Sequence, residues 1–226
     1  MITVPYAGGT SATYIRLLKN KLDGNIIYYD YPHHGARFGE KSSDSIEEIA
    51  VQLAETIANN IIVGKEFSIF GHSMGAMVSY CCEVILEQNY GLCANTLFLS
   101  ACLPPKLFYR TADFFKSYDE ITDYLINKRN LSYDLIKSEE FFECGIKPFC
   151  NDLELIKRFI PNTDSRISAP IVALCGTQDE DISPEDMCMW QEHTKNDFRL
   201  FKIFGDHFFI ETNTIAVLEI LMQYGI

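Results

Sequence analysis

The residues Gly71-His72-Ser73-Met74-Gly75 form a Gly-x-Ser-x-Gly pattern between a short apolar run and a helix-like segment. At a sharp turn from strand to helix, this spacing presents the serine hydroxyl above the sheet, and the flanking glycines relieve crowding. The first amides of the following helix then point toward an anion that forms at the serine. The pattern predicts Ser73 as a nucleophile and the Met74 N–H as an oxyanion donor, although ordinary strand-to-helix turns share the same spacing.

A serine nucleophile needs a base, and the base needs a carboxylate that fixes its tautomer. Asp179 follows an expected strand over residues 171–175, and His207 follows another over 198–204. Loops at the carboxyl ends of parallel strands gather at one edge of the sheet. The order Ser73, Asp179, His207 is typical of α/β-hydrolases. We therefore predict a catalytic triad of these three residues.

Other acids and histidines compete for these roles. Asp181 lies two residues beyond Asp179 and is the alternative acid, whereas Asp206 adjoins His207 and is poorly placed to reach its ring. Asp179 is favoured because it comes sooner after the strand. The remaining histidines are expected to be solvated or structural: His33, His34, His72 and His193.

A second oxyanion donor is expected in the loop Pro5-Tyr6-Ala7-Gly8-Gly9, which follows the first apolar stretch. In α/β-hydrolases, the loop after an early strand supplies one N–H to the oxyanion. The backbone of Ala7 is the candidate, and the two glycines would let the loop fold tightly over the site. A merely flexible turn is the alternative.

The expected elements around these residues alternate between strand and helix. Strands are predicted at the N-terminus and over 26–31, 67–70, 96–100, 171–175 and 198–204. Helices are predicted from Ser11, from Asp44, over 76–88, after Pro184 and after Thr212. Such alternation predicts a single α/β domain over 1–226 with a mainly parallel central sheet and helices on both faces. The order of Ser73, Asp179 and His207 along the chain favours the α/β-hydrolase fold for this domain.

The segment of about residues 104–163 breaks the alternation. It contains helix-like stretches around Phe114, Tyr124, Phe141 and Leu155 and no convincing strand. We interpret it as a helical lid inserted into the domain, with surface helices on the sheet edge as the alternative. The aromatic side chains of this segment suit an acyl-chain tunnel or ordinary packing equally. Its residues Lys106 and Arg110 are candidate contacts for a phosphate or an acidic partner.

Composition excludes several classes of protein. The 226 residues are 47% hydrophobic and carry a formal net charge of −12, which suits a folded domain and argues against nucleic acid or anionic membrane as partners. No apolar run approaches the length of a membrane span, and no leader precedes Val4, so we expect a cytoplasmic protein. The eight cysteines lack paired spacing, so neither disulfides nor a metal site is expected.

These motifs together resemble the stand-alone type II thioesterases of nonribosomal peptide and polyketide synthesis, nearly end to end. The resemblance rests on the two glycine-containing motifs above and on further segments: Tyr31-Pro32 with Arg37, Leu97-Phe98-Leu99-Ser100, Ser183-Pro184-Glu185-Asp186, Trp190 and His207-Phe208-Phe209. Three departures stand out. His33-His34 replaces a usual Gly-Arg, Asp206 replaces a usual glycine, and Ala101-Cys102-Leu103 replaces residues that are often basic.

The resemblance implies hydrolysis of acyl groups from the phosphopantetheine thiol of an acyl or peptidyl carrier domain of a synthase. Stalled or misloaded chains would be cleared in this way, and product would sometimes be released. No cofactor belongs to such an enzyme, because the pantetheine arrives with its partner, and a monomer is expected. A small-molecule esterase or thioesterase on the same fold, or a non-catalytic binding protein, remains the alternative.

Overall fold

A computed structural model describes residues 1–19, 21–22, 25–60, 65–113, 118–127, 129 and 131–225. Its centre is a six-stranded sheet in the order β2-β1-β3-β4-β5-β6, in which every neighbouring pair is parallel. The strands are β1 (Ile2–Val4), β2 (Ile27–Tyr28), β3 (Ser68–His72), β4 (Thr96–Ser100), β5 (Ile171–Gly176) and β6 (Phe198–Ile203). The predicted parallel sheet is confirmed.

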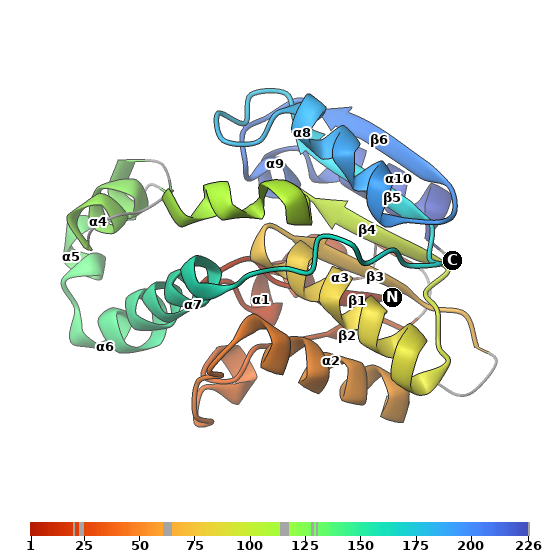
Figure 1. Cartoon of the computed structure of the whole chain (residues 1–226). Coiled ribbons are helices and arrows are strands. Elements are labelled where there is room, and N and C mark those ends of the chain that lie inside the picture. Colours follow the sequence, from red (N-terminus) through yellow and green to blue (C-terminus); the bar gives the residue numbers. More distant parts are fainter. Residues whose placement is uncertain are drawn as a thin grey trace.

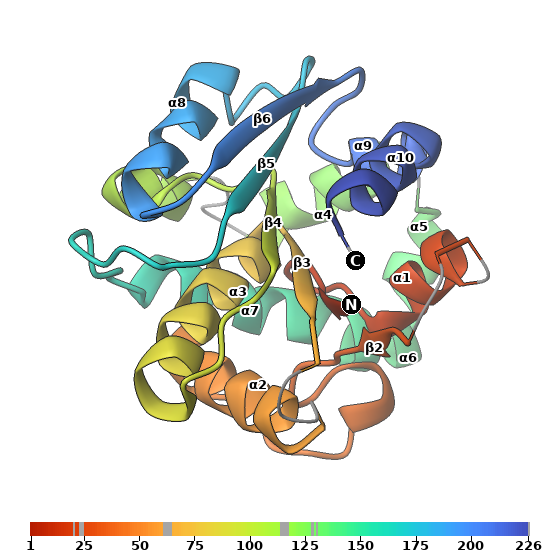
Figure 2. The ribbon, with the colours of Figure 1, turned by 90° about the vertical axis from the view of Figure 1, so that its right-hand side faces the viewer.

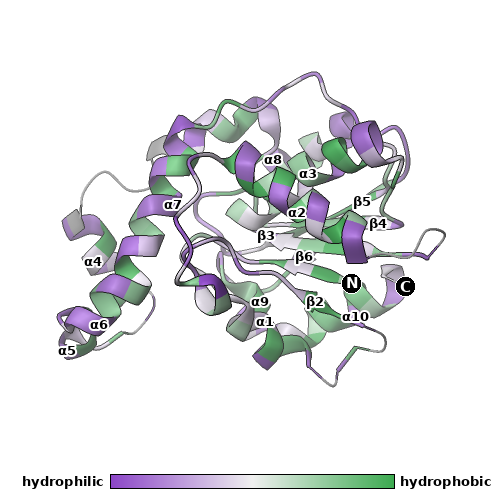
Figure 3. Cartoon of the chain, turned by 90° about the horizontal axis from the view of Figure 1, so that it is seen from below, coloured by the Kyte–Doolittle hydropathy of each residue, from purple (hydrophilic) through white to green (hydrophobic). Residues whose placement is uncertain are grey.

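Helices cover both faces of this sheet (Figures 2 and 3). One face carries α2 (Ile46–Asn60), α3 (Met74–Ile85), which continues into a π-helical turn (Leu86–Tyr90), and α8 (Pro184–Cys188). The other face carries α1 (Ser11–Leu18), α9 (Phe209–Thr212) and the mainly apolar α10 (Thr214–Tyr224). This two-sided covering is the arrangement that the alternating sequence pattern predicts.

Strand alternation divides the interior into two cores. Ile69, Leu97 and Ile171 pack toward α2 and α3, whereas their neighbours Phe70, Phe98 and Val172 pack toward α1 and α10. Successive side chains of a strand point to opposite faces, so a buried central strand must be apolar at every position. The centre of the sheet is thereby fixed as a rigid platform for the loops at its edge.

Local sequence explains where several elements begin and end. The Ser45 hydroxyl accepts the Glu48 N–H at 3.1 Å, and the Glu48 carboxylate accepts the Asp44 N–H at 2.7 Å, which caps α2. The strand predicted over 26–31 is shorter than expected. Beyond Tyr28 the chain leaves the sheet, because the Asp30 carboxylate turns to accept the N–H and hydroxyl of Ser11 at 2.6 and 2.8 Å.

The segment after β4 is mainly helical and contains no strand among its described residues, and we call residues 105–158 the helical insertion. It lies beyond the carboxyl ends of the strands, on the left of Figure 1. It contains a 3₁₀ helix (Pro105–Asp113), α4 (Tyr118–Asn127), α5 (Tyr133–Ile136), α6 (Glu139–Phe141), a π-helical turn (Phe142–Ile146) and α7 (Lys147–Arg158). The stretch expected around Phe114 lies outside the described residues. A final 3₁₀ helix (Met189–His193) follows α8.

None of the helices described combines the length and the apolar character that crossing a bilayer requires.

Candidate functional site

Ser73 occupies the turn between β3 and α3 in a conformation that few residues adopt. Its φ of 55° and ψ of −123° lie in a region that L-amino acids avoid, which costs on the order of 1–3 kcal/mol. The two flanking glycines are required sterically: a Cβ on Gly71 would lie 2.2 Å from the Gly75 carbonyl oxygen, and one on Gly75 would lie 2.3 Å from the Val4 carbonyl oxygen. The pattern therefore folds as a strained elbow.

His207 and Asp179 meet at the same edge of the sheet. His207 Nδ1 lies 2.8 Å from Asp179 Oδ2, and the Asp179 side chain is only 1% exposed. The other carboxylate oxygen, Oδ1, accepts the N–H groups of Asp181 and Ile182 at 3.0 and 3.2 Å. Because Nδ1 donates to the carboxylate, Nε2 is left as the basic nitrogen.

The alternative acid, Asp181, is placed differently. Asp181 is exposed, and the group through which it hydrogen-bonds to Asp179 is its backbone N–H. The loop after β5 thus uses Asp181 to hold the Asp179 carboxylate in its orientation toward His207.

Ser73, Asp179 and His207 line one cavity of about 360 Å³. The cavity wall also includes Ala7 and, from the helical insertion, apolar and aromatic side chains: Tyr124, Phe149, Leu153 and Ile156. A smaller, apolar recess of about 30 Å³ adjoins Ser73 on the side of Met74 and Phe108. The insertion therefore forms one wall of the space above the serine.

The two candidate oxyanion donors come from adjacent loops. Met74 is the first residue of α3, so its N–H has no acceptor within the helix. Ala7 lies in the loop after β1 and shares the cavity wall with Ser73. The close approach of Gly75 to the carbonyl oxygens of Val4 and Pro5 brings this loop against the elbow, since any side chain there would push it away.

The histidines outside this pair have structural contacts. His72 is fully buried, and its Nδ1 lies 2.8 Å from Ser100 Oγ. Burial, together with the neighbouring His207, holds the pKa of His72 well below its ordinary value, so the ring is neutral. His193 contacts Tyr80 and the Ser165 carbonyl oxygen.

His34 and Asp152 form a buried ion pair that the sequence reasoning missed. His34 Nε2 lies 3.0 Å from Asp152 Oδ2, and the two side chains are 4% and 3% exposed. His33, just before it, has a φ of 67°, the left-handed conformation that glycine adopts most easily. A helical Asp and a loop His so far apart in sequence carry no local signal of their contact.

Three basic residues of the insertion pair with acids that lie outside it. Arg110 Nη1 lies 2.8 Å from Asp186 Oδ1, and Lys106 pairs with Glu192. Arg129 Nη2 lies 2.8 Å from Glu211 Oε1, and its guanidinium carbon lies 3.8 Å from the centre of the Phe208 ring. These contacts fasten the insertion to α8, to the 3₁₀ helix that follows it, and to α9, which begins two residues after His207.

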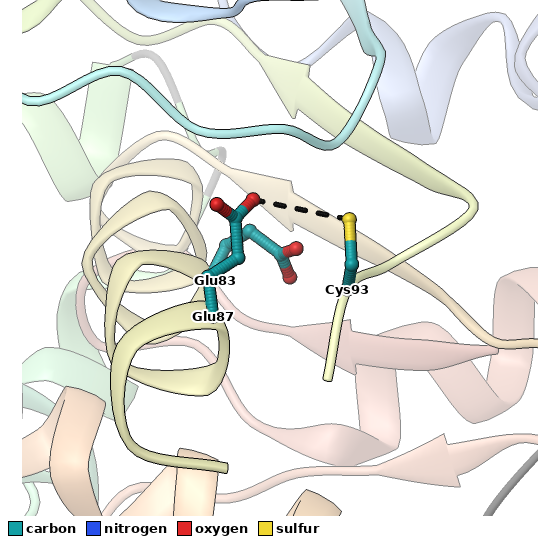
Figure 4. Close-up of side chains that lie close together, drawn as sticks. All are labelled: Glu83, Glu87 and Cys93. Atoms are coloured by element: carbon teal, nitrogen blue, oxygen red, sulfur yellow. Dashed lines mark hydrogen bonds between the residues drawn. The ribbon is translucent and has the colours of Figure 1, made fainter. Parts of the chain in front are cut away.

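Two carboxylates and a thiol approach one another at the opposite end of α3: Glu83, Glu87 and Cys93 (Figure 4). This is the group, among the described residues, whose spacing could hold a metal ion. Ala94 N–H donates to Glu83 Oε1 at 2.9 Å, and Glu87 Oε1 accepts the Ala169 N–H at 3.2 Å. These contacts give both carboxylates a role in tying the starts of β4 and β5 to the helix.

The sequence of this chain is similar to those of known proteins. The thioesterase domain family model matches residues 1–223. Thioesterase TesA of Mycobacterium marinum is 29% identical over 213 residues, which are 92% of this chain and 84% of TesA. Phenyloxazoline synthase MbtB of Mycobacterium tuberculosis is 27% identical over 223 residues, which are 98% of this chain and 16% of that synthase.

The same fold occurs in solved structures. The structure of YbtT, a type II thioesterase from the yersiniabactin NRPS/PKS biosynthetic pathway, matches with a TM-score of 0.83 and 21% sequence identity. The match covers 99% of this chain and 91% of YbtT. The sheet, the surrounding helices and the helical insertion thus have a counterpart of known structure.

Proposed function

The chain belongs to the thioesterase domain family, and on this premise we propose that it hydrolyses acyl groups from the phosphopantetheine thiol of a carrier domain. The reaction proceeds through an acyl-serine intermediate on Ser73. The observation that carries the proposal is the buried Asp179 carboxylate, which lies 2.8 Å from His207 Nδ1 in the same cavity as the strained Ser73. A binding protein has no need for this combination.

The proposed chemistry has two halves. In the first, Ser73 Oγ attacks the thioester carbonyl while His207 Nε2 takes its proton, and the N–H groups of Ala7 and Met74 hold the oxyanion. Collapse breaks the carbon–sulfur bond, and His207 returns the proton to the departing thiolate.

In the second half, His207 takes a proton from water, which attacks the acyl-serine. Ser73 regains its proton from His207, and the acyl group leaves as a carboxylic acid. Asp179 keeps Nδ1 protonated and stabilises the imidazolium in both halves. The chain needs no cofactor of its own for these steps, because the pantetheine belongs to the substrate.

The two recesses beside Ser73 suit the two halves of such a substrate. The larger cavity, which the insertion walls on one side, would admit the pantetheine arm, whereas the small apolar recess beside Met74 and Phe108 would take the acyl group. We propose a carrier domain of a nonribosomal peptide or polyketide synthase as partner, a monomeric state and a cytoplasmic location. Nucleic acid and membrane are not proposed as partners, given the net charge of −12.

The choice of substrate is tested by presenting one acyl group in two forms. Turnover is measured on acetyl-holo-carrier protein and on acetyl-pantetheine, with Ser73→Ala as the control that removes the nucleophile. A higher kcat/KM on the carrier-bound form supports the proposal. Equal values on both forms would favour a small-molecule thioesterase, and no turnover on either, with acyl-pantetheine still bound, would favour a binding protein.

A further inference from the structure

The loop that carries Ala7 is held at two points, one on either side of that residue. The Tyr31 hydroxyl donates to the Pro5 carbonyl oxygen, and the Gly8 N–H donates to Asp152 Oδ2 at 2.7 Å. Asp152 belongs to α7, the last helix of the insertion. The orientation of the Ala7–Gly8 peptide, which follows the Ala7 N–H by one peptide unit, therefore depends on a side chain from the insertion.

Packing between α7 and this loop leaves little freedom. Gly8 has a φ of 69°, and a Cβ built on it would lie 2.8 Å from the Cβ of Phe149. Phe149 and Asp152 are one helical turn apart, so they meet the loop from the same face of α7. One contact sets the distance between helix and loop, and the other fixes the direction of the Gly8 N–H.

The contacts of the His34 ring indicate which of its nitrogens carry protons. Its Nδ1 lies 3.0 Å from the Pro32 carbonyl oxygen, which can only accept, so Nδ1 carries a proton. Its Nε2 faces Asp152 Oδ2 at 3.0 Å, the same oxygen that accepts from Gly8. Both nitrogens face oxygen atoms that can only accept, although the contact of Nε2 lacks hydrogen-bond geometry, and an imidazolium beside a carboxylate is the charge state that suits this arrangement.

The surroundings of His34 agree with this charge state. Burial is the largest single influence and lowers the pKa of His34, but Asp152, the Pro32 carbonyl and Asp30 together raise it, and the net change is upward. Asp30 also favours the protonated ring, and the Tyr31 ring packs against it edge-on. A buried pair of opposite charges that is linked to a backbone N–H is costly to break on one side only.

We propose that His34 and Asp152 are positioning residues that hold the Ala7–Gly8 peptide against the helical insertion, and through it the preceding Tyr6–Ala7 peptide, whose N–H is one half of the oxyanion hole. The inference rests on the proposed function, because it concerns the N–H that would stabilise the oxyanion. It gives the insertion a role in catalysis beyond forming a wall of the cavity, since a displaced α7 would turn the Ala7 N–H away from the reacting carbonyl.

An oxyanion contact forms fully only in the transition state, so its loss lowers kcat and leaves KM nearly unchanged. Removing one oxyanion donor entirely costs about 10²–10³ in kcat, and a misplaced donor should cost at least about tenfold. General damage to the cavity would raise KM as well. The division between kcat and KM therefore separates positioning from a structural role.

Asp152→Asn is the sharpest variant, because it preserves size. The amide of the new asparagine carries no charge. When its oxygen faces the Gly8 N–H, the buried imidazolium of His34 is left without a counter-charge. The His34 pKa should then fall, because burial, which lowers it, is opposed only by the Pro32 carbonyl and by Asp30. His34→Gln removes the same charge pair from the other side, so the double variant should lose about as much kcat as either single variant.

Asn151→Ala is the matched control. Asn151 is the neighbour of Asp152 on α7, and its Nδ2 donates to Ser42 Oγ at 3.3 Å. This substitution removes a contact between the insertion and the core without touching Gly8. Its kcat should remain within about twofold of the wild type, as expected for a side chain outside such a network.

The experiment measures kcat and KM of each variant on acetyl-holo-carrier protein, together with unfolding in denaturant and the NMR titration of the His34 ring. We expect kcat to fall at least about tenfold in Asp152→Asn and His34→Gln with KM within about twofold, and the His34 pKa to fall in Asp152→Asn. Folded variants with unchanged kcat, or an equal loss in Asn151→Ala, would overturn the inference. An inactive wild type would instead refute the proposed function.

Discussion

Replacing Asp179 with asparagine tests the proposed base through its tautomer. The N–H groups of Asp181 and Ile182 both point at Asp179 Oδ1, at 3.0 and 3.2 Å. In Asp179→Asn these two donors select the oxygen of the new amide, so its NH₂ group takes the place of Oδ2 and faces His207 Nδ1. Two donors cannot share a hydrogen bond, so Nδ1 must lose its proton and become the acceptor.

The proton then moves to His207 Nε2, which can no longer accept the Ser73 proton. The same substitution in a serine protease triad lowers kcat about 10⁴-fold. We expect a comparable loss here, about 5 kcal/mol of transition-state stabilisation, because the two backbone donors fix the amide in the inhibitory orientation. The assay measures kcat on acetyl-holo-carrier protein. Unfolding in denaturant checks that the variant still folds, because the Asp179 side chain is only 1% exposed.

Asp181→Asn is the companion variant, because Asp181 contributes its backbone N–H rather than its carboxylate to Asp179. We expect its kcat to change by less than about threefold, as for other exposed substitutions. The reasoning is refuted if Asp179→Asn loses less than about tenfold while remaining folded, or if Asp181→Asn is the more damaging of the two.

Three further perturbations test other parts of the account. Ser73→Gly and Ser73→Ala should both abolish turnover, but the glycine variant should be the more stable by about 1 kcal/mol, because it relieves the φ of 55°; equal unfolding midpoints would count against strain at the elbow. Burial raises the pKa of Glu83 to about 7 in the folded protein. The neutral form therefore contributes roughly 3 kcal/mol to the free energy of unfolding, which is fully present below a pH of about 4.5 and is lost as the pH rises through about 7. Glu83→Gln should abolish that loss, which unfolding at pH 5 and pH 8 measures, and an unchanged pH dependence would contradict the assignment. Arg129→Gln removes the contacts with Glu211 and Phe208, so KM for acyl-carrier protein should rise by more than kcat falls; steady-state kinetics decide, and a change in kcat alone would place Arg129 in the chemistry instead.

The sheet and the elbow were predictable because their signals are local. A short, mainly apolar run such as 96–100 is too short for a typical helix and favours a buried central strand, and the structure has the same bounds. The spacing of Gly71, Ser73 and Gly75 likewise reflects contacts within a few residues of the turn and with the adjacent first strand. The positions of Asp179 and His207 followed from one rule, that loops at the carboxyl ends of parallel strands share an edge.

The contacts of the insertion could not be predicted, because they join distant segments. Asp152 sits between polar and apolar residues of α7, and nothing beside it in sequence distinguishes it from a solvated helical acid. His34 was expected to be solvated or structural, and its burial became visible only when Pro32 and Asp152 were both in place around it. Phe114 and Phe115, part of the expected aromatic lining, lie outside the described residues.

The most direct test of the central claim is to identify the acylated residue. The protein is mixed with acetyl-holo-carrier protein, quenched in acid within milliseconds and digested, and the peptides are examined by mass spectrometry. We expect one acetyl group on Ser73, in an amount that rises and decays with turnover, and none in Ser73→Ala. An acetyl group on another residue that forms and decays at the rate of turnover, or undiminished turnover in Ser73→Ala, would contradict the account.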